Sequence, residues 1–339
     1  STLVGCLFIF IHSTHAEVSR PEVLRTLSLT EAVEMAIKAN PTYRSALSNA
    51  RAAEGLTYQS GLWENPVFFG EAEEYPPEDS FEESRYVLGL SQTVPFPGKK
   101  RLDQAAASEQ ERSRKSMSDS TRIDLIRRVR IAFYQVLVAE KLVAESEKLL
   151  SFASSSVETA KERLEAGVST AQELLRAEVQ AERVKNSKLG FERNLKIARA
   201  ELAFTMGEPD LKEIGIAGKL SEEIPKGLLE FDNEEVVRKH PKVLAAEALL
   251  RRSGALKERA QLEPYPDVTL SVAGGRREAT DETLIDFGFS IPLPILNSSK
   301  GDVLAASENE RKAKSDLQQV RQRLKTQLTN ELETLKRAN

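Results

Sequence analysis

An internal duplication constrains this 339-residue sequence more than any other feature. Short segments of the first half recur in the same order in the second half, each about 200 residues later. Such matches predict two copies of one structural unit, and a period this long excludes a solenoid of short repeats. The matched segments are Asn40-Pro41 with His240-Pro241, Asn65-Pro66 with Tyr265-Pro266, Val94-Pro95-Phe96 with Ile291-Pro292-Leu293, and the run from Ala106 to Arg112 with the run from Ala305 to Arg311.

Each copy has the same predicted order of elements: a helix, two strands and a second, long helix. In the first copy we predict a helix over 31–61, with a kink or break at Pro41, because proline lacks an amide hydrogen and clashes with the preceding turn. Strands are predicted over 67–73 and 86–94, separated by an acidic, exposed loop. The second copy predicts a helix over 233–263 and strands over 268–273 and 284–291.

The last predicted strand has the clearest alternation. Apolar side chains share one face, while small or polar ones share the other. A strand between lipid and a water-filled lumen needs this pattern, although an ordinary half-buried sheet gives it too. Four such strands, paired within a duplication and flanked by very long helices, favour the membrane. The apolar face carries Ile285, Phe287, Phe289 and Ile291, and the other face carries Asp286, Gly288 and Ser290.

The helices are too long for a globular domain. No proline or glycine interrupts residues 102–165, which would span on the order of 90 Å as one helix. A turn follows at Gly167, and the next helix has apolar residues at alternating spacings of three and four, the pattern of a coiled-coil seam. Lys188 is its one polar position. The seam contains Leu174, Ala177, Ala181, Val184, Lys188, Phe191, Leu195, Ala198 and Leu202.

These patterns divide the chain into four segments. Residues 1–16 read as part of a secretory signal peptide, because an apolar run from Leu3 to Ile11 precedes a small-residue cleavage site at Ala16. A lipoprotein cleavage box ending at Cys6 is an alternative interpretation. Residues 17–206 form the first repeat, 207–232 a connector, and 233–339 a second repeat that lacks its returning helix and is therefore expected to be truncated.

Composition excludes several classes of function. The formal net charge of −4 gives no general basic character for nucleic acid. One cysteine and three scattered histidines offer no disulfide framework, thiolate metal site or histidine cluster. No catalytic constellation or glycine-rich phosphate loop is present, so we expect no catalytic, cofactor-binding or metal-binding residues and no enzyme. His240 aligns with Asn40 in the repeat, which favours a structural role.

Several motifs together resemble the TolC family of outer-membrane efflux channels, and most closely the branch that serves heavy-metal exporters of the resistance–nodulation–division class. The resemblance covers nearly the whole chain after residue 16. It implies a mainly α protein with a transmembrane β part: long coiled-coil-like helices that form an α-barrel, plus four strands contributed to a trimeric twelve-stranded β-barrel. The motifs are Ala36 to Pro41, Asn65-Pro66, Leu90 to Arg101, and Arg163 to Thr170 followed by Leu174 to Glu178.

The resemblance also implies partners and sites. It predicts a homotrimer in the Gram-negative outer membrane that extends into the periplasm, contacts lipid, and passively exports substrates, with heavy-metal cations as one expectation. A periplasmic adaptor and an inner-membrane resistance–nodulation–division pump would supply them at a hairpin tip marked by Arg163, Gly167 and Thr170. Rival interpretations are that the chain is itself the adaptor, or a soluble coiled-coil scaffold. Strand-to-helix junctions that avoid exposing backbone donors are expected at Pro95, Pro97, Gly98, Pro292 and Pro294.

Overall fold

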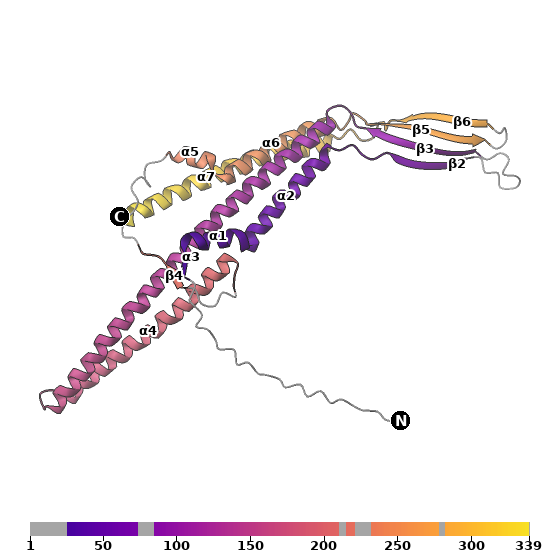
Figure 1. Cartoon of the computed structure of the whole chain (residues 1–339). Helices are drawn as coiled ribbons and strands as arrows, with labels where there is room; N and C mark the ends of the chain where they lie inside the picture. Colours follow the sequence, from indigo (N-terminus) through magenta and orange to yellow (C-terminus); the bar gives the residue numbers. More distant parts are fainter. Residues whose placement is uncertain (1–25, 74–84, 210–214, 221–231, 278–281, 339) are drawn as a thin grey trace, which may run out of the picture. The chain divides into compact units, whose positions relative to one another are not determined.

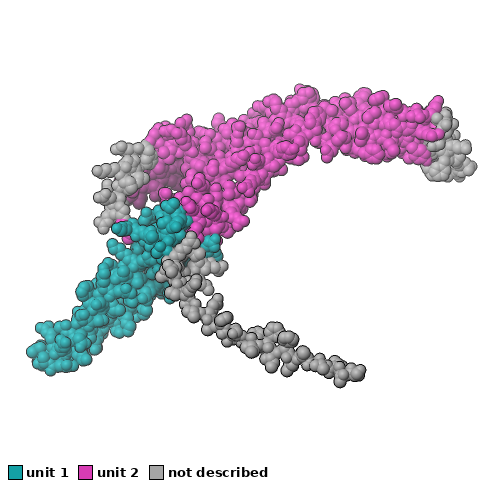
Figure 2. All heavy atoms as spheres, in the orientation of Figure 1, with its two compact units in different colours: residues 1–32, 132–204, 208–219 teal, residues 33–131, 205–207, 220–339 magenta. Residues whose placement is uncertain are grey.

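A computed structural model describes residues 26–73, 85–209, 215–220, 232–277 and 282–338. The chain divides into two compact units, which Figure 2 colours separately. The long helix α3 (Lys99–Glu165) contributes its first part to unit 2 and its second part, from residue 132, to unit 1. The predicted signal peptide, Cys6, the acidic loop after Glu73 and most of the predicted connector lie outside the described residues.

Unit 1 is built on a helical hairpin, formed by the second part of α3 and by α4 (Ala171–Met206) (Figure 1). Two short strands, β1 (Thr26–Ser28) and β4 (Gly215–Ala217), pair in parallel beside it and bury Leu27. The chain then passes close to α3 at Gly218, where a Cβ atom would lie 2.9 Å from the Leu137 side chain. A side chain at this position would therefore displace the packing around Leu137.

The predicted seam of α4 is confirmed. Every seam position from Leu174 to Leu202 is buried or half-buried, while most residues between them are exposed. Lys188, the polar seam residue, forms ion pairs with Glu147 of α3 at 3.3 Å and with Glu192 at 3.2 Å. The seam thus tolerates a lysine because its ammonium group reaches carboxylates at the edge of the hairpin.

Unit 2 contains four long helical segments side by side, in the order α2 (Pro41–Gly61), first part of α3, α6 (Pro241–Gln261) and α7 (Lys300–Ala338) (Figure 1). Salt bridges connect each neighbouring pair, and α2 and α7 lie at the two edges. No helix among the described residues is both long and apolar enough to cross a membrane. The salt bridges are Glu54–Lys115 between α2 and α3, Glu109–Arg251, Asp103–Arg259 and Asp124–Lys242 between α3 and α6, and Lys257–Glu310 and Glu247–Arg321 between α6 and α7.

The helices predicted over 31–61 and 233–263 are each broken before a proline. Helix α1 (Leu29–Ala39) ends at Asn40, and α5 (Asn233–Lys239) ends at His240. The side chains of Asn40 and His240 then cap α2 and α6, because the Asn40 Oδ1 accepts a hydrogen bond from Thr42 N and the His240 Nδ1 accepts one from Lys242 N. Both capped helices are 21 residues long.

A four-stranded antiparallel sheet extends from the ends of these helices (Figure 1). Its strands are β2 (Val67–Glu73), β3 (Arg85–Val94), β5 (Val268–Arg277) and β6 (Glu282–Ser290), in the spatial order β2-β3-β5-β6. Strand β5 extends four residues beyond its predicted end and β6 begins two residues before its predicted start, because Gly274 and Gly275 continue the ladder. Each strand is connected to one of these helices, β2 to α2, β3 to α3, β5 to α6 and β6 to α7, so strands and helices follow the same order. Strands β2 and β6 lie at the edges of the sheet.

Candidate functional site

The sheet has one apolar face along most of its length. Cross-strand neighbours Phe68, Leu90, Val272 and Phe287 form one row of this face, and Gly70, Leu88, Gly274 and Ile285 form the next. Phe287 and Phe289 are 82% and 76% exposed, respectively. Water-soluble proteins rarely display an apolar surface this continuous, whereas a strand facing hydrocarbon requires one.

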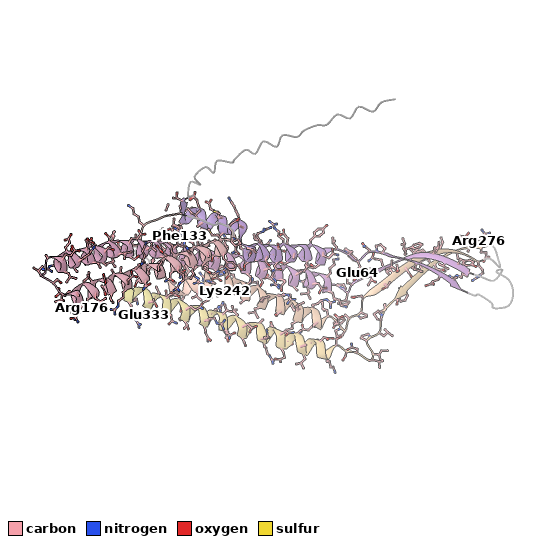
Figure 3. The ribbon with its side chains drawn as sticks, turned by 90° about the horizontal axis from the view of Figure 1, so that it is seen from below. Glu64, Phe133, Arg176, Lys242, Arg276 and Glu333 are labelled. Carbon is pink, nitrogen blue, oxygen red and sulfur yellow. The ribbon has the colours of Figure 1, made fainter. Side chains whose placement is uncertain are left out.

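The opposite face, which we call the polar face, carries charged and hydroxyl side chains beside a few apolar ones, among them Phe69, Val87 and Leu284. Near the end of the sheet that carries Arg276 (Figure 3), the register places Glu73, Arg85, Arg277 and Glu282 in one row across all four strands. Arg85 also forms an ion pair with Asp286 on this face. Farther along the sheet, Thr93 and Thr269 share a hydrogen bond of 3.0 Å. A wall with one apolar and one charged, hydroxyl-bearing face can separate lipid from water.

The first strand-to-helix junction is held by a carboxylate from a distant part of the sequence. Asp267 accepts a hydrogen bond from Phe96 N at 2.7 Å and binds Lys99 Nζ at 2.9 Å. Partial burial opposes ionisation of Asp267, but these two donors outweigh it and lower the pKa of the carboxyl group. The Lys99 side chain is only 4% exposed, so this lysine depends on Asp267 for its counter-charge.

The predicted junction residues occupy the same place. Pro95 and Pro97 flank the Phe96 amide, and Gly98 adopts a φ of +97°, which allows the chain to turn into α3. The Phe96 ring stacks on Tyr265 with centroids 4.9 Å apart. Sequence reasoning missed Asp267, Lys99 and Tyr265. The available signal was a carboxylate directly after the repeated Pro266, where the first copy has Val67.

The second junction is open by comparison. Pro292 and Pro294 lie in a segment whose large apolar side chains Leu293, Ile295 and Leu296 are 72%, 79% and 102% exposed. The turn into α7 uses Ser299, at a φ of +50°, whose amide donates to Asn297 Oδ1 at 2.9 Å. Both junctions thus lead from a strand through a proline-containing segment into a long helix, but only at the first does another segment pack against the junction.

The predicted tip residues lie together at the turn between α3 and α4. The amide of Val168 donates to Arg163 O at 2.9 Å, and the amide of Gly167 donates to Leu164 O at 2.9 Å. These two bonds form a Schellman motif, for which Gly167 supplies a φ of +72°. Thr170 caps the N-terminus of α4, where its Oγ1 accepts a hydrogen bond from Glu173 N at 3.4 Å. The turn is thus well defined by its own backbone.

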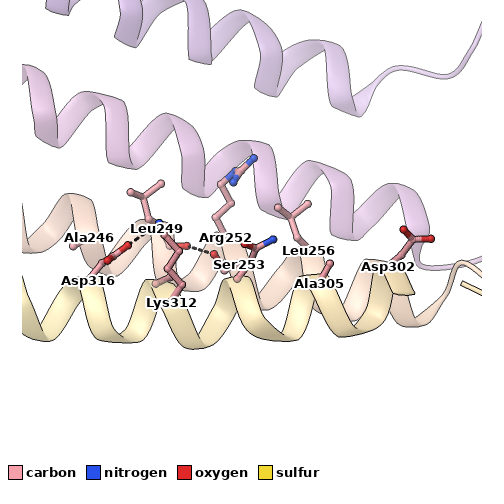
Figure 4. A pocket seen from close by; sticks show the side chains of 12 residues that line it. Ala246, Leu249, Arg252, Ser253, Leu256, Asp302, Ala305, Lys312 and Asp316 are labelled. Atoms are coloured by element: carbon pink, nitrogen blue, oxygen red, sulfur yellow. Dashed lines mark hydrogen bonds and ion pairs between the residues drawn. The ribbon is translucent and has the colours of Figure 1, made fainter. Parts of the chain in front are cut away.

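Grooves between the helices offer no recognisable chemistry. The groove between α6 and α7 holds about 520 Å³ and is lined by small and charged side chains such as Ala246, Ser253, Ala305 and Lys312 (Figure 4). Within the described residues, no group of three or more histidine, cysteine, aspartate or glutamate side chains could hold a metal ion. The surfaces that the described residues offer are therefore the two-faced sheet and the row of long helices.

Comparisons with known proteins agree with this geometry. The sequence pattern described as "Outer membrane efflux protein" matches residues 72–208. The cobalt-zinc-cadmium resistance protein CzcC of Cupriavidus metallidurans is 24% identical over 297 residues, which cover 87% of this chain and 69% of that protein.

Solved structures with the same fold include outer-membrane proteins. A membrane protein from Pseudomonas aeruginosa superposes with a TM-score of 0.75 at 20% identity, covering 91% of this chain and 77% of that one. VceC of Vibrio cholerae gives a TM-score of 0.70 at 19% identity, with 87% and 75% covered. CusC gives 0.67 at 16% identity, with 91% and 74% covered. Residues 72–208 therefore belong to the outer membrane efflux protein family, and the chain has the fold of these solved outer-membrane proteins.

Proposed function

We propose that this chain is one of three identical subunits of an outer-membrane conduit that exports heavy-metal cations. As a member of an efflux channel family, the protein lies in the outer membrane, extends into the periplasm and is not an enzyme. The adaptor and coiled-coil scaffold alternatives lack support, because neither needs four strands with an apolar exposed face.

The observation that carries the proposal is the two-faced sheet with free edges. Backbone groups at a sheet edge cannot remain unpaired in hydrocarbon. The four strands of one chain are too few to close on themselves, since roughly eight strands form the narrowest barrels. Three copies would supply twelve strands and place the row of Glu73, Arg85, Arg277 and Glu282 around a water-filled lumen.

Heavy-metal cations are the proposed substrate class because of the resemblance to CzcC, whose name assigns it to cobalt, zinc and cadmium resistance. The polar face of the sheet suits this role. It carries both signs of charge and hydroxyl groups but no cysteine, histidine or methionine in its described strands. A conduit must release its substrate, and carboxylate and hydroxyl oxygens allow release because they bind these cations only weakly.

The tip of the α3–α4 hairpin is the proposed contact for a periplasmic adaptor. Val168 is 71% exposed at the turn, beside Gly167 and Thr170. An exposed valine side chain on a well-defined turn suits an end-to-end contact with the turn of another helical hairpin. Arg163 would add a charge to this contact. The inner-membrane pump supplies the energy, because the conduit itself is passive.

Two measurements test the proposal. Purified protein in planar bilayers should give discrete conductance steps, and its mass in detergent should be that of a trimer. In a strain lacking its own metal-efflux conduit, the gene should restore growth on zinc, cobalt or cadmium more than on lipophilic drugs. Absence of conductance would refute the channel. Rescue on drugs alone would refute the metal assignment but leave the channel intact.

A further inference from the structure

The apolar face of the sheet carries one charged side chain within its described strands, that of Arg276. The register places Arg276 between Tyr86 of β3 and Thr283 of β6, and the same row ends at Ala72 of β2. Arg276 is exposed and Tyr86 is 39% exposed, so both side chains reach the surface of this face. A cation on a face that otherwise suits hydrocarbon is costly unless the bilayer supplies a polar partner at that depth.

The row with Arg276 lies at the end of the sheet that is farthest from the helices (Figure 3). Because the protein extends into the periplasm, this end of the sheet faces the exterior. Tyr86 and Val94, near the two ends of β3, are eight residues apart, which is about 27 Å along the strand. In a barrel strand tilted by about 40° this becomes roughly 21 Å across the membrane, close to the ~25 Å height of a lipid-facing band. The row therefore lies at the level of the outer headgroups.

The side chains of this row suit a phosphate group at that level. The guanidinium group of Arg276 can donate two parallel hydrogen bonds to phosphate oxygens. Tyr86 can place its ring against acyl chains and its hydroxyl group among the headgroups, as aromatic residues do at membrane interfaces. Thr283 brings a second hydroxyl group to the other side of the arginine. The row thus offers a positive charge between two hydroxyl groups.

The next row toward the helices leaves room for a hydrocarbon chain. Glycine alternates there with large apolar residues, in the order Gly70, Leu88, Gly274 and Ile285. Leu88 and Ile285 are 61% and 69% exposed, whereas a Cβ at Gly274 would meet no atom closer than the Leu284 carbonyl oxygen, at 3.9 Å. Gly274 precedes Arg276 by two residues on the same face of β5. Open space between two apolar side chains therefore begins directly beside the arginine.

We propose that Arg276, Tyr86 and Thr283 bind a phosphate group of lipopolysaccharide in the outer leaflet. One acyl chain of the same molecule lies over Gly274. Lipopolysaccharide fits both features, because it forms the outer leaflet of a Gram-negative outer membrane and its lipid A carries phosphate groups above several acyl chains. Phospholipids of the inner leaflet meet the other end of the apolar face, which has no cation within the described strands. The inference rests on the proposed outer-membrane conduit and adds a specific lipid at its outer rim.

The neighbouring Arg277 provides a matched control, because it has the same side chain on the polar face, in the row of Arg85 and Glu282. The full chain, purified in detergent from outer membranes, is titrated with lipid A and with dephosphorylated lipid A, and bound lipid is counted by native mass spectrometry. Lipid A should bind roughly tenfold more tightly than the dephosphorylated form, because only lipid A offers a charged acceptor. Arg276→Gln should remove most of this difference, and Arg277→Gln should leave it unchanged.

A second variant tests the acyl chain separately from the phosphate. Gly274→Leu fills the open space beside Arg276 and leaves every charge in place. It should weaken the binding of lipid A roughly tenfold, because the acyl chain loses its apolar contact with the sheet. Inorganic phosphate, which has the charge without the chains, should displace lipid A only at concentrations about a hundredfold higher. All three variants should conduct as the unchanged protein does, since two alter the lipid-facing side and Arg277→Gln leaves the pore open.

The outcomes separate the lipid site from the conduit. Equal affinities for the two forms of lipid A, or equal losses from Arg276→Gln and Arg277→Gln, overturn the proposed site and leave the channel standing. Displacement of lipid A by an equal concentration of inorganic phosphate, or unchanged binding by Gly274→Leu, overturns the assignment to a lipid. A protein that is not recovered from the outer membrane and does not conduct overturns the proposed function itself.

Discussion

Replacement of Asp267 gives the sharpest test of how the first junction is held. Asp267→Ala removes the counter-charge of Lys99 and the acceptor for Phe96 N at once. Loss of one partner from a buried pair costs about 3–5 kcal/mol. The Asp267 side chain is 34% exposed, so we place the cost at the lower end, at about 3 kcal/mol.

The size of the effect depends on which partner is removed. Lys99→Met leaves a partly exposed aspartate that still accepts from Phe96 N, so it should cost only about 1 kcal/mol. The double variant Lys99→Met with Asp267→Asn should be less damaged than Asp267→Ala alone, because no lysine is then left buried without a counter-charge.

Hydrogen exchange of the assembled protein measures this locally, where a global unfolding energy would be ill defined. A cost of about 3 kcal/mol corresponds to roughly 150-fold faster exchange of the Leu102 and neighbouring amides at the start of α3. Because the pKa of Asp267 is lowered in the folded protein, its contribution is present at neutral pH and above. It disappears as the pH falls through the folded value, below about 4. Equal effects of Asp267→Ala and Lys99→Met would refute the reasoning.

Three further predictions concern other parts of the chain. Gly207→Ala should destabilise the end of α4 by about 3 kcal/mol, because φ is +84° and a Cβ would lie 2.8 Å from the Asn40 backbone, whereas Gly167→Ala, at a similar φ in open space, should cost about 1 kcal/mol. Hydrogen exchange in the two segments compares them, and equal costs would contradict the steric argument. His240→Asn should abolish the acid sensitivity of α6. Burial, aided by Lys242 and opposed by Asp124, lowers the pKa of His240, so its neutral cap stabilises at neutral pH and is lost as the pH falls below about 6.5. Exchange of the α6 amides at pH 7 and 5 measures it, and an unchanged pH dependence in the variant would exclude His240. Phe287→Arg should cost about 2–4 kcal/mol of insertion energy and thereby lower the amount of assembled protein in the outer membrane, whereas Ser290→Arg on the opposite face should be tolerated. Equal losses from the two variants would show that the face of Phe287 is not the one that contacts lipid.

The sequence alone determined the local elements of this protein. The coiled-coil seam from Leu174 to Leu202, the turn at Gly167 and the break before Pro41 all follow from spacing and backbone chemistry within a few residues. The alternation around Phe287 gave the two faces of β6 for the same reason, since side chains of a strand alternate regardless of its neighbours. The motifs were sufficient to recognise the family.

Contacts between distant residues were decided only by the tertiary structure. Lys99 and Asp267 are 168 positions apart, and Asn40 Nδ2 donates to Thr205 O across 165 positions. The parallel pair β1–β4 escaped the sequence analysis because three residues carry too little periodicity. The order β2-β3-β5-β6 likewise could not be derived, because strand neighbours depend on which helices pack together. Spacing along a chain specifies which face a residue occupies, but the partner on that face is chosen by packing and by satisfaction of buried charges and hydrogen bonds.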